Sequence, residues 1–218
     1  MSQKPTALLM AMMEPPVALE TEFQDWYDTE HFPERANCEG FVTAQRFVCI
    51  DGWPRYLALY DLADIGVMTG PGYRAIAVDK YSIWTNRIIA QVWGQYRADG
   101  NQVYPGNALL GAKGAAARLV VMRFRNAPAS AQGAIVEGIR AIYEKQPETA
   151  QVRVFETKSA DGIDYIGLIE LHAPYAPPPG AVAALKDGLR YLDIVNTYVS
   201  YRRRLPNIVA QHGTVPQK

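Results

Sequence analysis

Two stretches of similar sequence decide the fold, Arg55-Tyr56-Leu57-Ala58-Leu59-Tyr60-Asp61-Leu62 and Asp164-Tyr165-Ile166-Gly167-Leu168-Ile169-Glu170-Leu171. They lie roughly 110 residues apart, a spacing that indicates an internal repeat. Each is rich in aromatic and branched apolar residues, and each follows an Asp-Gly pair, Asp51-Gly52 or Asp161-Gly162. An Asp-Gly pair between two such runs is typical of a β-hairpin turn. The sequence therefore predicts a hairpin at corresponding places in two halves of the chain.

The first half extends this pattern on both sides of its hairpin. An apolar run bounded by prolines at 8–13 predicts a buried strand. Apolar residues at three- and four-residue steps over 17–32 predict an amphipathic helix. Because Pro33 disfavours helical geometry at the preceding residue, we expect this helix to end at about His31. The other predicted elements are hairpin strands at 41–50 and 55–62, an interrupted helix at 64–78 and a fourth strand at 88–96.

The second half repeats the order β-α-β-β-α-β, after a glycine-rich stretch at 98–116 that predicts a connector. Its predicted elements are strands at 118–124, 151–157, 164–171 and 196–203 and helices at 130–143 and 181–191. We therefore predict an α+β protein of two tandem ferredoxin-like repeats, 1–100 and 117–218, joined by a linker at 101–116. Each repeat leaves one sheet face to be covered. The two repeats can close on each other, or each can pair with a second chain.

Composition excludes several classes of protein. The 22 basic and 22 acidic residues of the 218-residue chain balance, so no basic surface for nucleic acid is expected. The short run Arg202-Arg203-Arg204 is predicted to block pairing at a strand end. Cys38 and Cys49 lack further ligands at metal spacing, so we expect reduced structural thiols and no metal. No apolar run reaches the roughly 18 residues of a membrane helix, and the first residues do not fit a signal peptide. We therefore expect a cytoplasmic protein.

One of the three histidines stands out. His172 follows a predicted strand and His212 lies in a predicted tail, whereas His31 shares a helix face with Trp26 and Tyr27. A helix C-terminus and nearby carboxylates favour its protonated form, and apolar burial favours its neutral form, so the direction of its pKa shift stays open. One interpretation is that His31 caps a helix by bonding a backbone carbonyl; the other is that it transfers protons.

The neighbours of His31 favour the functional interpretation. Aromatic, acidic, basic and titratable side chains gather within ten residues, namely Trp26, Tyr27, Asp28, Glu30, His31 and Arg35. The predicted helix of the second half, which ends near Tyr143 and Glu144, has no histidine. We therefore expect one site per chain, with the second repeat serving as scaffold or as a dimerisation surface.

The segment from Trp26 to Arg35, followed by Gly40-Phe41 and Arg46, resembles the EthD-like proteins of the dimeric α+β barrel superfamily. These proteins carry a Tyr-Asp-x-x-His-x-Pro motif after the first helix, which here falls on Tyr27, Asp28, His31 and Pro33. The resemblance implies a substrate cavity between sheet and helices, with His31 facing it. The superfamily includes cofactor-free oxygenases, cyclases, isomerases, dehydratases and some haem enzymes, so the resemblance fixes no reaction. No second feature of the sequence supports haem.

Further residues are candidates for the walls of this cavity, each with a plain alternative. Arg46 can bind an anion or lie on a solvated strand face. Tyr56 and Tyr60 alternate on one strand face and can donate hydrogen bonds or pack in the core. Trp84 and Arg87 can cover a flat substrate. The predicted substrate-binding residues are Trp26, Arg46, Tyr56, Tyr60, Trp84 and Arg87, and the predicted catalytic residues are His31, Tyr27 and Asp28.

The leading functional hypothesis is a small, cofactor-independent lyase or isomerase, a class that includes cyclases and dehydratases. It would act on an aromatic or polyketide-like compound with His31 as general base or acid. One alternative is a cofactor-free monooxygenase of an electron-rich aromatic. Another is a ligand-binding or stress-response protein without catalysis. In each case we expect a homodimer with a small-molecule partner, no cofactor or metal, and neither nucleic acid nor membrane.

Overall fold

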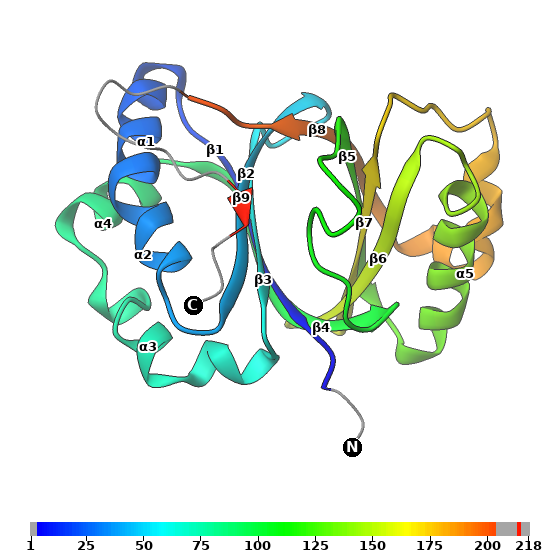
Figure 1. Cartoon of the computed structure of the whole chain (residues 1–218), viewed down its shortest axis with the longest axis horizontal. Helices are drawn as coiled ribbons and strands as arrows, with labels where there is room; N and C mark the ends of the chain where they lie inside the picture. The colour runs from blue at the N-terminus through cyan, green and yellow to red at the C-terminus, as the bar shows by residue number, and fades with distance from the viewer. Residues whose placement is uncertain (1–3, 204–212, 215–218) are drawn as a thin grey trace.

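Eight strands close into a barrel within one chain (Figure 1). The computed structural model describes residues 4–203 together with Gly213 and Thr214. Around the barrel the strands follow the order β3-β1-β4-β6-β7-β5-β8-β2, and β2 pairs back with β3. Their bounds are β1 Ala7–Glu14, β2 Phe41–Asp51, β3 Tyr56–Leu62, β4 Trp93–Tyr104, β5 Arg118–Ala127, β6 Thr149–Lys158, β7 Ile163–Leu171 and β8 Leu192–Ser200. The short β9, Gly213–Thr214, pairs with β2.

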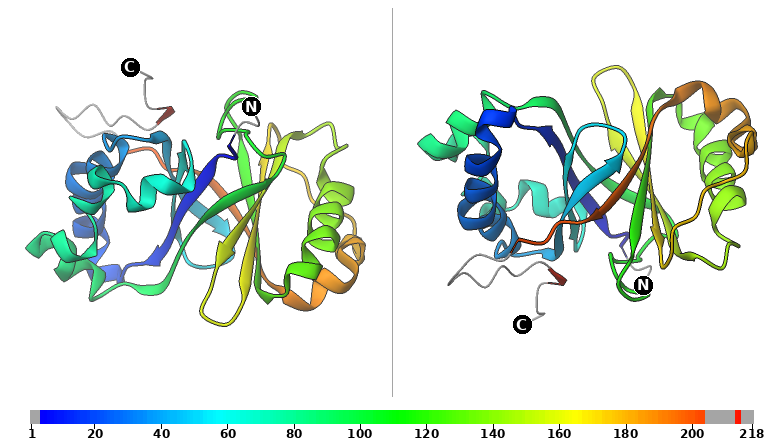
Figure 2. Two further views of the ribbon diagram at one scale, coloured as in Figure 1. Left: turned by 90° about the horizontal axis from the view of Figure 1, so that it is seen from below. Right: turned by 90° about the horizontal axis from the view of Figure 1, so that it is seen from above.

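The helices lie outside the barrel on two opposite sides, one group against the outer sheet face of each half (Figure 2). The first group comprises η1 Val17–Leu19, α1 Glu20–Trp26, η2 Tyr27–His31, α2 Phe32–Ala36, η3 Ile65–Thr69, α3 Pro71–Arg74, η4 Val78–Lys80 and α4 Ile83–Ile89. The second group comprises η5 Ala129–Ala131, α5 Gln132–Tyr143 and η6 Ala181–Tyr191. No helix in the described part of the chain is long and apolar enough to cross a membrane.

Each half is a ferredoxin-like antiparallel sheet, so the predicted fold class is confirmed. The first half has the strand order β4-β1-β3-β2 and the second has β6-β7-β5-β8. The halves join at two seams, β4 with β6 and β2 with β8. Of the two arrangements left open by the sequence, the structure has the barrel closed within a single chain.

The β4–β6 seam depends on a glycine. Gly100 pairs with Thr157, and a Cβ atom at Gly100 would lie 1.9 Å from the Glu156 carbonyl oxygen. No side chain fits at that distance from a backbone atom, so the strands approach closely only because residue 100 has none.

Strand alternation divides the apolar side chains into three cores. One fills the barrel and includes Leu8, Met10, Phe155 and Leu168. Another lies between the first sheet and its helices, and the last lies between the second sheet and α5 with η6. Both faces of each sheet are therefore covered, as a ferredoxin-like sheet requires.

A buried ionic cluster closes one end of the barrel. Arg153 Nη1 lies 2.7 Å from Asp61 Oδ1, its Nη2 lies 3.2 Å from Glu170 Oε1, and all three side chains are buried. The connector between the halves is tied to the same carboxylates, because the backbone N–H of Leu110 donates to Asp61 and that of Gly111 to Glu170. The guanidinium thus compensates two carboxylates that also hold the connector.

Several predicted boundaries are wrong. The helix predicted to end at His31 continues to Ala36, as described below. The strand predicted at 88–96 is β4, Trp93–Tyr104, because 83–89 extends the helical segment as α4. β4 therefore includes the first residues of the predicted connector, where alternation with the buried Ala98, Gly100 and Gln102 outweighs the glycine content. The last strand ends at Ser200 rather than at Arg203, and Arg204 lies outside the described residues.

Replacing Arg153 with Met should lower the free energy of unfolding by about 3–5 kcal/mol, because it leaves two buried carboxylates without their cation. Urea denaturation of the whole chain measures this loss. Arg190, which forms an exposed ion pair with Asp187, provides the control. Arg190→Met should change stability by less than about 1 kcal/mol, and an equal loss in the two variants would contradict the structural role of the cluster.

Candidate functional site

The motif segment forms an unbroken helical path in which one turn is a π-helix. The helix runs through α1, η2 and α2, and the N–H of Phe32 bonds to the carbonyl of Tyr27, five residues back. Pro33 has no N–H to donate and lies in the first turn after this wide turn. The π-turn therefore lets the helix pass the proline, which explains why the predicted end at His31 is wrong. Such turns often occur at functional sites.

His31 is enclosed by aromatic side chains. Its ring centroid lies 4.2 Å from that of Trp26, 5.2 Å from that of Tyr27 and 6.2 Å from that of Tyr81. The residue is only 4% exposed, and its Nδ1 has no hydrogen-bond partner among the described residues. A buried imidazole nitrogen without a partner is costly, so this atom is a candidate to bond a ligand.

A cavity of about 210 Å³ lies beside His31, between the first sheet and its helices. Its apolar wall includes Leu9, Ala11 and Met13 of β1. Its polar wall consists of side chains from the helices, from β3 and β4 and from the loop between η4 and α4, namely Tyr27, His31, Arg35, Tyr60, Tyr73, Tyr81, Gln95, Tyr96 and Arg97. The location matches the one implied by the superfamily resemblance.

The cavity is electropositive, because two of its lining residues are arginines and none is Asp or Glu. The buried Arg35 donates to the carbonyl of His31 at 3.2 Å. Arg97 is half-exposed and donates to the Tyr73 hydroxyl at 3.1 Å. Arg35 also pairs with Glu34, and Arg97 with Asp99, but neither carboxylate lines the cavity. Two guanidinium groups beside His31 therefore favour a negatively charged ligand or intermediate.

Burial decides the protonation state of His31. Desolvation, followed by the positive charges of Arg35 and Arg46, holds the pKa of His31 well below its ordinary value. The carboxylates expected to oppose this shift have other partners: Glu30 accepts from Ser82 and Thr85. At neutral pH the imidazole is therefore uncharged and able to accept a proton.

Tyr27 and Tyr60 stay protonated at neutral pH. Burial raises the pKa of Tyr27 and, more strongly, that of Tyr60. The Tyr60 hydroxyl makes no hydrogen bond of ordinary geometry to the described residues. Its nearest polar neighbour is the Tyr27 hydroxyl, so the two phenols lie side by side next to His31.

Asp28 and Arg46 form a buried ion pair that contacts Tyr27 and does not line the cavity. Arg46 Nη1 donates to Asp28 Oδ1 at 2.5 Å. The guanidinium lies between the rings of Tyr27 and Tyr201, with its central carbon 4.1 Å from each centroid. The Tyr201 hydroxyl also donates to Asp28. This cluster ties β2 and the end of β8 to the helix that carries His31.

The other predicted residues divide between the cavity and its surroundings. Tyr60 lines the cavity, and Trp26 supports the His31 ring while donating to Thr85. Tyr56 lies on the same strand face as Tyr60 but donates to Glu20, away from the cavity. Trp84 and Arg87 lie on α4 rather than just before a strand, and both donate to Glu22 of α1.

Sequence reasoning missed Tyr73, Tyr81 and Arg97. Arg97 falls between the strand predicted at 88–96 and the glycine-rich stretch at 98–116, whereas the register places it opposite Ala11 of β1. Tyr73 and Tyr81 lie in the irregular segment before β4. The alternation of Gln95, Arg97 and Asp99 along β4 was the signal that could have found the arginine.

The corresponding space in the second half is filled. Ala11 pairs with Ala58 in the first sheet, and Met122 pairs with Gly167 at the corresponding place in the second. Ile139 of α5 packs so closely on Gly167 that an added Cβ would lie 2.7 Å from its side chain. His172 is exposed at a strand end, and His212 lies outside the described residues.

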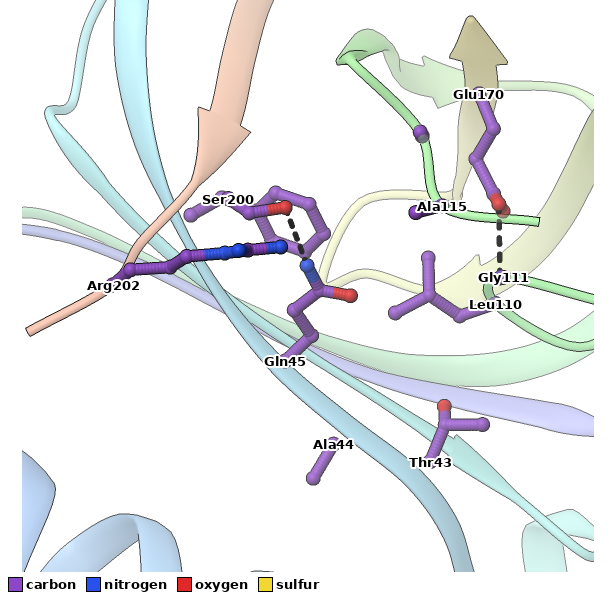
Figure 3. Close-up of a pocket in the computed structure, with 11 residues that line it drawn as sticks. Thr43, Ala44, Gln45, Leu110, Gly111, Ala115, Glu170, Ser200 and Arg202 are labelled. Carbon is purple, nitrogen blue, oxygen red and sulfur yellow. Dashed lines mark hydrogen bonds between the residues drawn. The ribbon is translucent and has the colours of Figure 1, made fainter. Parts of the chain in front are cut away.

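A second cleft, of about 260 Å³, opens where the connector passes the ends of β2, β7 and β8 (Figure 3). Gln45 donates to Ser200, Glu170 accepts from Gly111, and Arg202 extends across the opening. Its polar groups belong to the ionic cluster and the seam, and no histidine or cysteine lines it.

The donor set around His31 does not fit a metal or haem. No group of three His, Cys, Asp or Glu side chains in the described ranges could hold a metal ion. The cavity of about 210 Å³ is smaller than the roughly 300–1,000 Å³ usual for sites of drug-sized ligands, so a tetrapyrrole does not fit.

Comparison with known proteins supports the fold. No family model matches the chain, and no curated protein matches its sequence. An anthrone oxidase-like protein superposes with a TM-score of 0.66 at 11% identity, covering 91% of this chain and 92% of that one. A mutant chlorite dismutase from Candidatus Nitrospira defluvii gives 0.52 at 10% identity, covering 90% and 92%. A monooxygenase, described as putative, from Lactobacillus acidophilus NCFM gives 0.50 at 10% identity, covering 90% and 94%. The chain therefore has the fold of the dimeric α+β barrel proteins.

Proposed function

We propose that this protein is a small acid/base enzyme in which His31 takes a proton from an aromatic or polyketide-like substrate. The observation that carries the proposal is the buried, uncharged imidazole whose Nδ1 lacks a partner beside an electropositive cavity. A general base has to be unprotonated and within reach of its substrate, and this nitrogen meets the first condition at neutral pH. The enzymes among proteins of this fold support an enzymatic role.

The proposed step moves one proton and one electron pair. His31 takes a proton from a carbon next to a substrate carbonyl, and the electron pair of the C–H bond moves into that carbonyl to form an enolate. Arg35 and Arg97 stabilise the negative charge, and the Tyr27 and Tyr60 hydroxyls donate to the oxygen that carries it. Protonated His31 then returns the proton to another carbon, which gives an isomerase, or to a departing hydroxyl, which gives a dehydratase.

The remaining motif residues receive supporting roles in this proposal. Tyr27 touches both the cavity and the His31 ring. Asp28 acts through Arg46, whose guanidinium packs on Tyr27, so it is a positioning residue. Membership among the EthD-like proteins, a cytoplasmic location and a homodimer complete the proposal.

Replacing His31 with Gln should lower kcat/KM by about 10²–10⁴-fold, the usual contribution of a general base. Steady-state kinetics on any substrate that the protein converts measures the loss. His172→Gln removes an exposed histidine outside the cavity and should leave the rate unchanged. A His31→Gln variant that folds and retains near-full activity would eliminate this mechanism.

The pH profile of kcat/KM should stay flat from neutral pH to below 6.5. A base acts only when unprotonated, and the pKa of His31 lies well below its ordinary value. The rate should therefore fall only when the pH passes below that lowered pKa, by about tenfold per pH unit. Kinetics between about pH 4 and 8 measures the profile. A midpoint at or above the ordinary histidine value of about 6.5 would contradict an uncharged buried base.

A second candidate is a cofactor-free monooxygenase that starts from the same enolate. The observation that favours it is the apolar wall of Leu9, Ala11 and Met13, which gives dissolved oxygen an apolar space beside the substrate. The enolate would reduce O₂ to a peroxide anion bonded to the substrate carbon, and protonated His31 would return its proton to give the hydroperoxide. Loss of water would then leave a new carbonyl.

Oxygen-electrode measurements during turnover separate the two reactions. Isomerisation or dehydration should proceed at an unchanged rate without oxygen, whereas the monooxygenase should consume one O₂ for each substrate molecule and stop in its absence. Binding with recovery of unchanged ligand under both conditions would instead indicate a ligand-binding protein.

A further inference from the structure

The His31 cavity has a charged mouth. Arg97 of β4 lines the cavity while its side chain remains 46% exposed. Its Nη1 donates to Asp99 at 2.9 Å and its Nη2 to the Tyr73 hydroxyl at 3.1 Å. A guanidinium has five N–H donors, so these bonds leave donors for a ligand. Arg97 therefore has both the position and the capacity to bind an anionic group entering from solvent.

The inner part of the cavity has the opposite character. His31, Tyr27 and Tyr60 are each less than 5% exposed, and Leu9 and Ala11 complete the apolar wall. Aromatic and apolar surfaces here suit a planar ring. His31, Tyr27 and Tyr60 line this part of the cavity and place polar side chains beside a substituent on that ring.

The volume limits the size of the ring system. A cavity of roughly 150 Å³ in another protein binds benzene. The cavity beside His31, at about 210 Å³, has room for one ring with small substituents. Three fused rings exceed that space. The cavity volume therefore limits the aromatic or polyketide-like substrates of the proposed function to compounds with one ring.

From this arrangement we infer that the substrate is an anion with a single ring, either aromatic or partly saturated. Its carboxylate binds Arg97 at the mouth, and its ring reaches His31. A carboxylate matches the planar fork of a guanidinium, and an ammonium group would be repelled by Arg35 and Arg97. The inference rests on the proposed function in one respect, that the bound anion is a substrate. Binding of the anion itself is measured without turnover and does not depend on that function.

Isothermal titration of the full-length chain with benzoate tests the charge, using benzamide as an uncharged analogue of the same shape. Benzoate should bind at least ten times more tightly than benzamide. Arg97→Gln should weaken benzoate binding at least tenfold, the loss expected for a charge-assisted hydrogen bond, and leave benzamide unchanged. Arg74→Gln removes an exposed arginine of α3 outside the cavity lining and should leave both affinities unchanged.

A parallel titration tests the size. Anthracene-2-carboxylate carries the same charged group on three fused rings and should bind at least tenfold more weakly than benzoate. Equal affinity for benzoate and benzamide, an Arg97→Gln variant that binds benzoate normally, or tighter binding of the three-ring acid would each overturn the inference.

Failure of this inference differs from failure of the proposed function. If His31→Gln abolishes turnover of an uncharged substrate and Arg97→Gln does not affect benzoate, the acid/base function stands and the anionic class is wrong. If benzoate binds through Arg97 and none of the single-ring acids tested is converted, the cavity binds aromatic anions as inferred and the acid/base function fails.

Discussion

Each four-stranded ferredoxin-like sheet has two apolar faces, and the need to cover both determines the rest of this structure. Helices cover one face of each sheet, and the other two faces meet inside the barrel. Closure brings carboxylates from both halves to one barrel end, where Arg153 of β6 compensates Asp61 of β3 and Glu170 of β7. The interior is consequently packed, which leaves the space between sheet and helices as the place for a ligand.

The first half keeps such a space beside His31, and its difference from the second half lies in a few side chains. Ala11 and Ala58 face the helices where the second half has Met122 and Gly167, and Ile139 fills the room above the glycine. In the first half the π-turn places the His31 ring beside Trp26 and Tyr27 and next to the cavity. Two halves with the same strand order thus have different contents, one a core and the other a candidate site.

The fold and the central residue were predictable because they depend on local patterns. The repeated hairpins and the periodicity of 17–32 gave the order of elements, and the spacing of Trp26, Tyr27 and His31 predicted a buried ring. Closure within one chain was not predictable, since it depends on β2 pairing with β8 across about 150 residues. Arg97 was missed for the same reason: its place beside His31 depends on strand register and helix packing rather than on nearby sequence.

The buried ion pair of Asp28 and Arg46 shows why a motif does not by itself identify the reacting groups. Asp28 lies three residues before His31, yet its carboxylate is held by Arg46 and Tyr201. Arg46 adds a positive charge near the imidazole, which lowers the pKa of His31 together with burial and Arg35. The pair therefore fixes the helix that carries His31, and its arginine disfavours protonation of the imidazole. A motif aspartate can in this way position the segment that carries His31 without lining the cavity. The cost of burying the ion pair is met by its close geometry and by the rings of Tyr27 and Tyr201, which pack against the guanidinium.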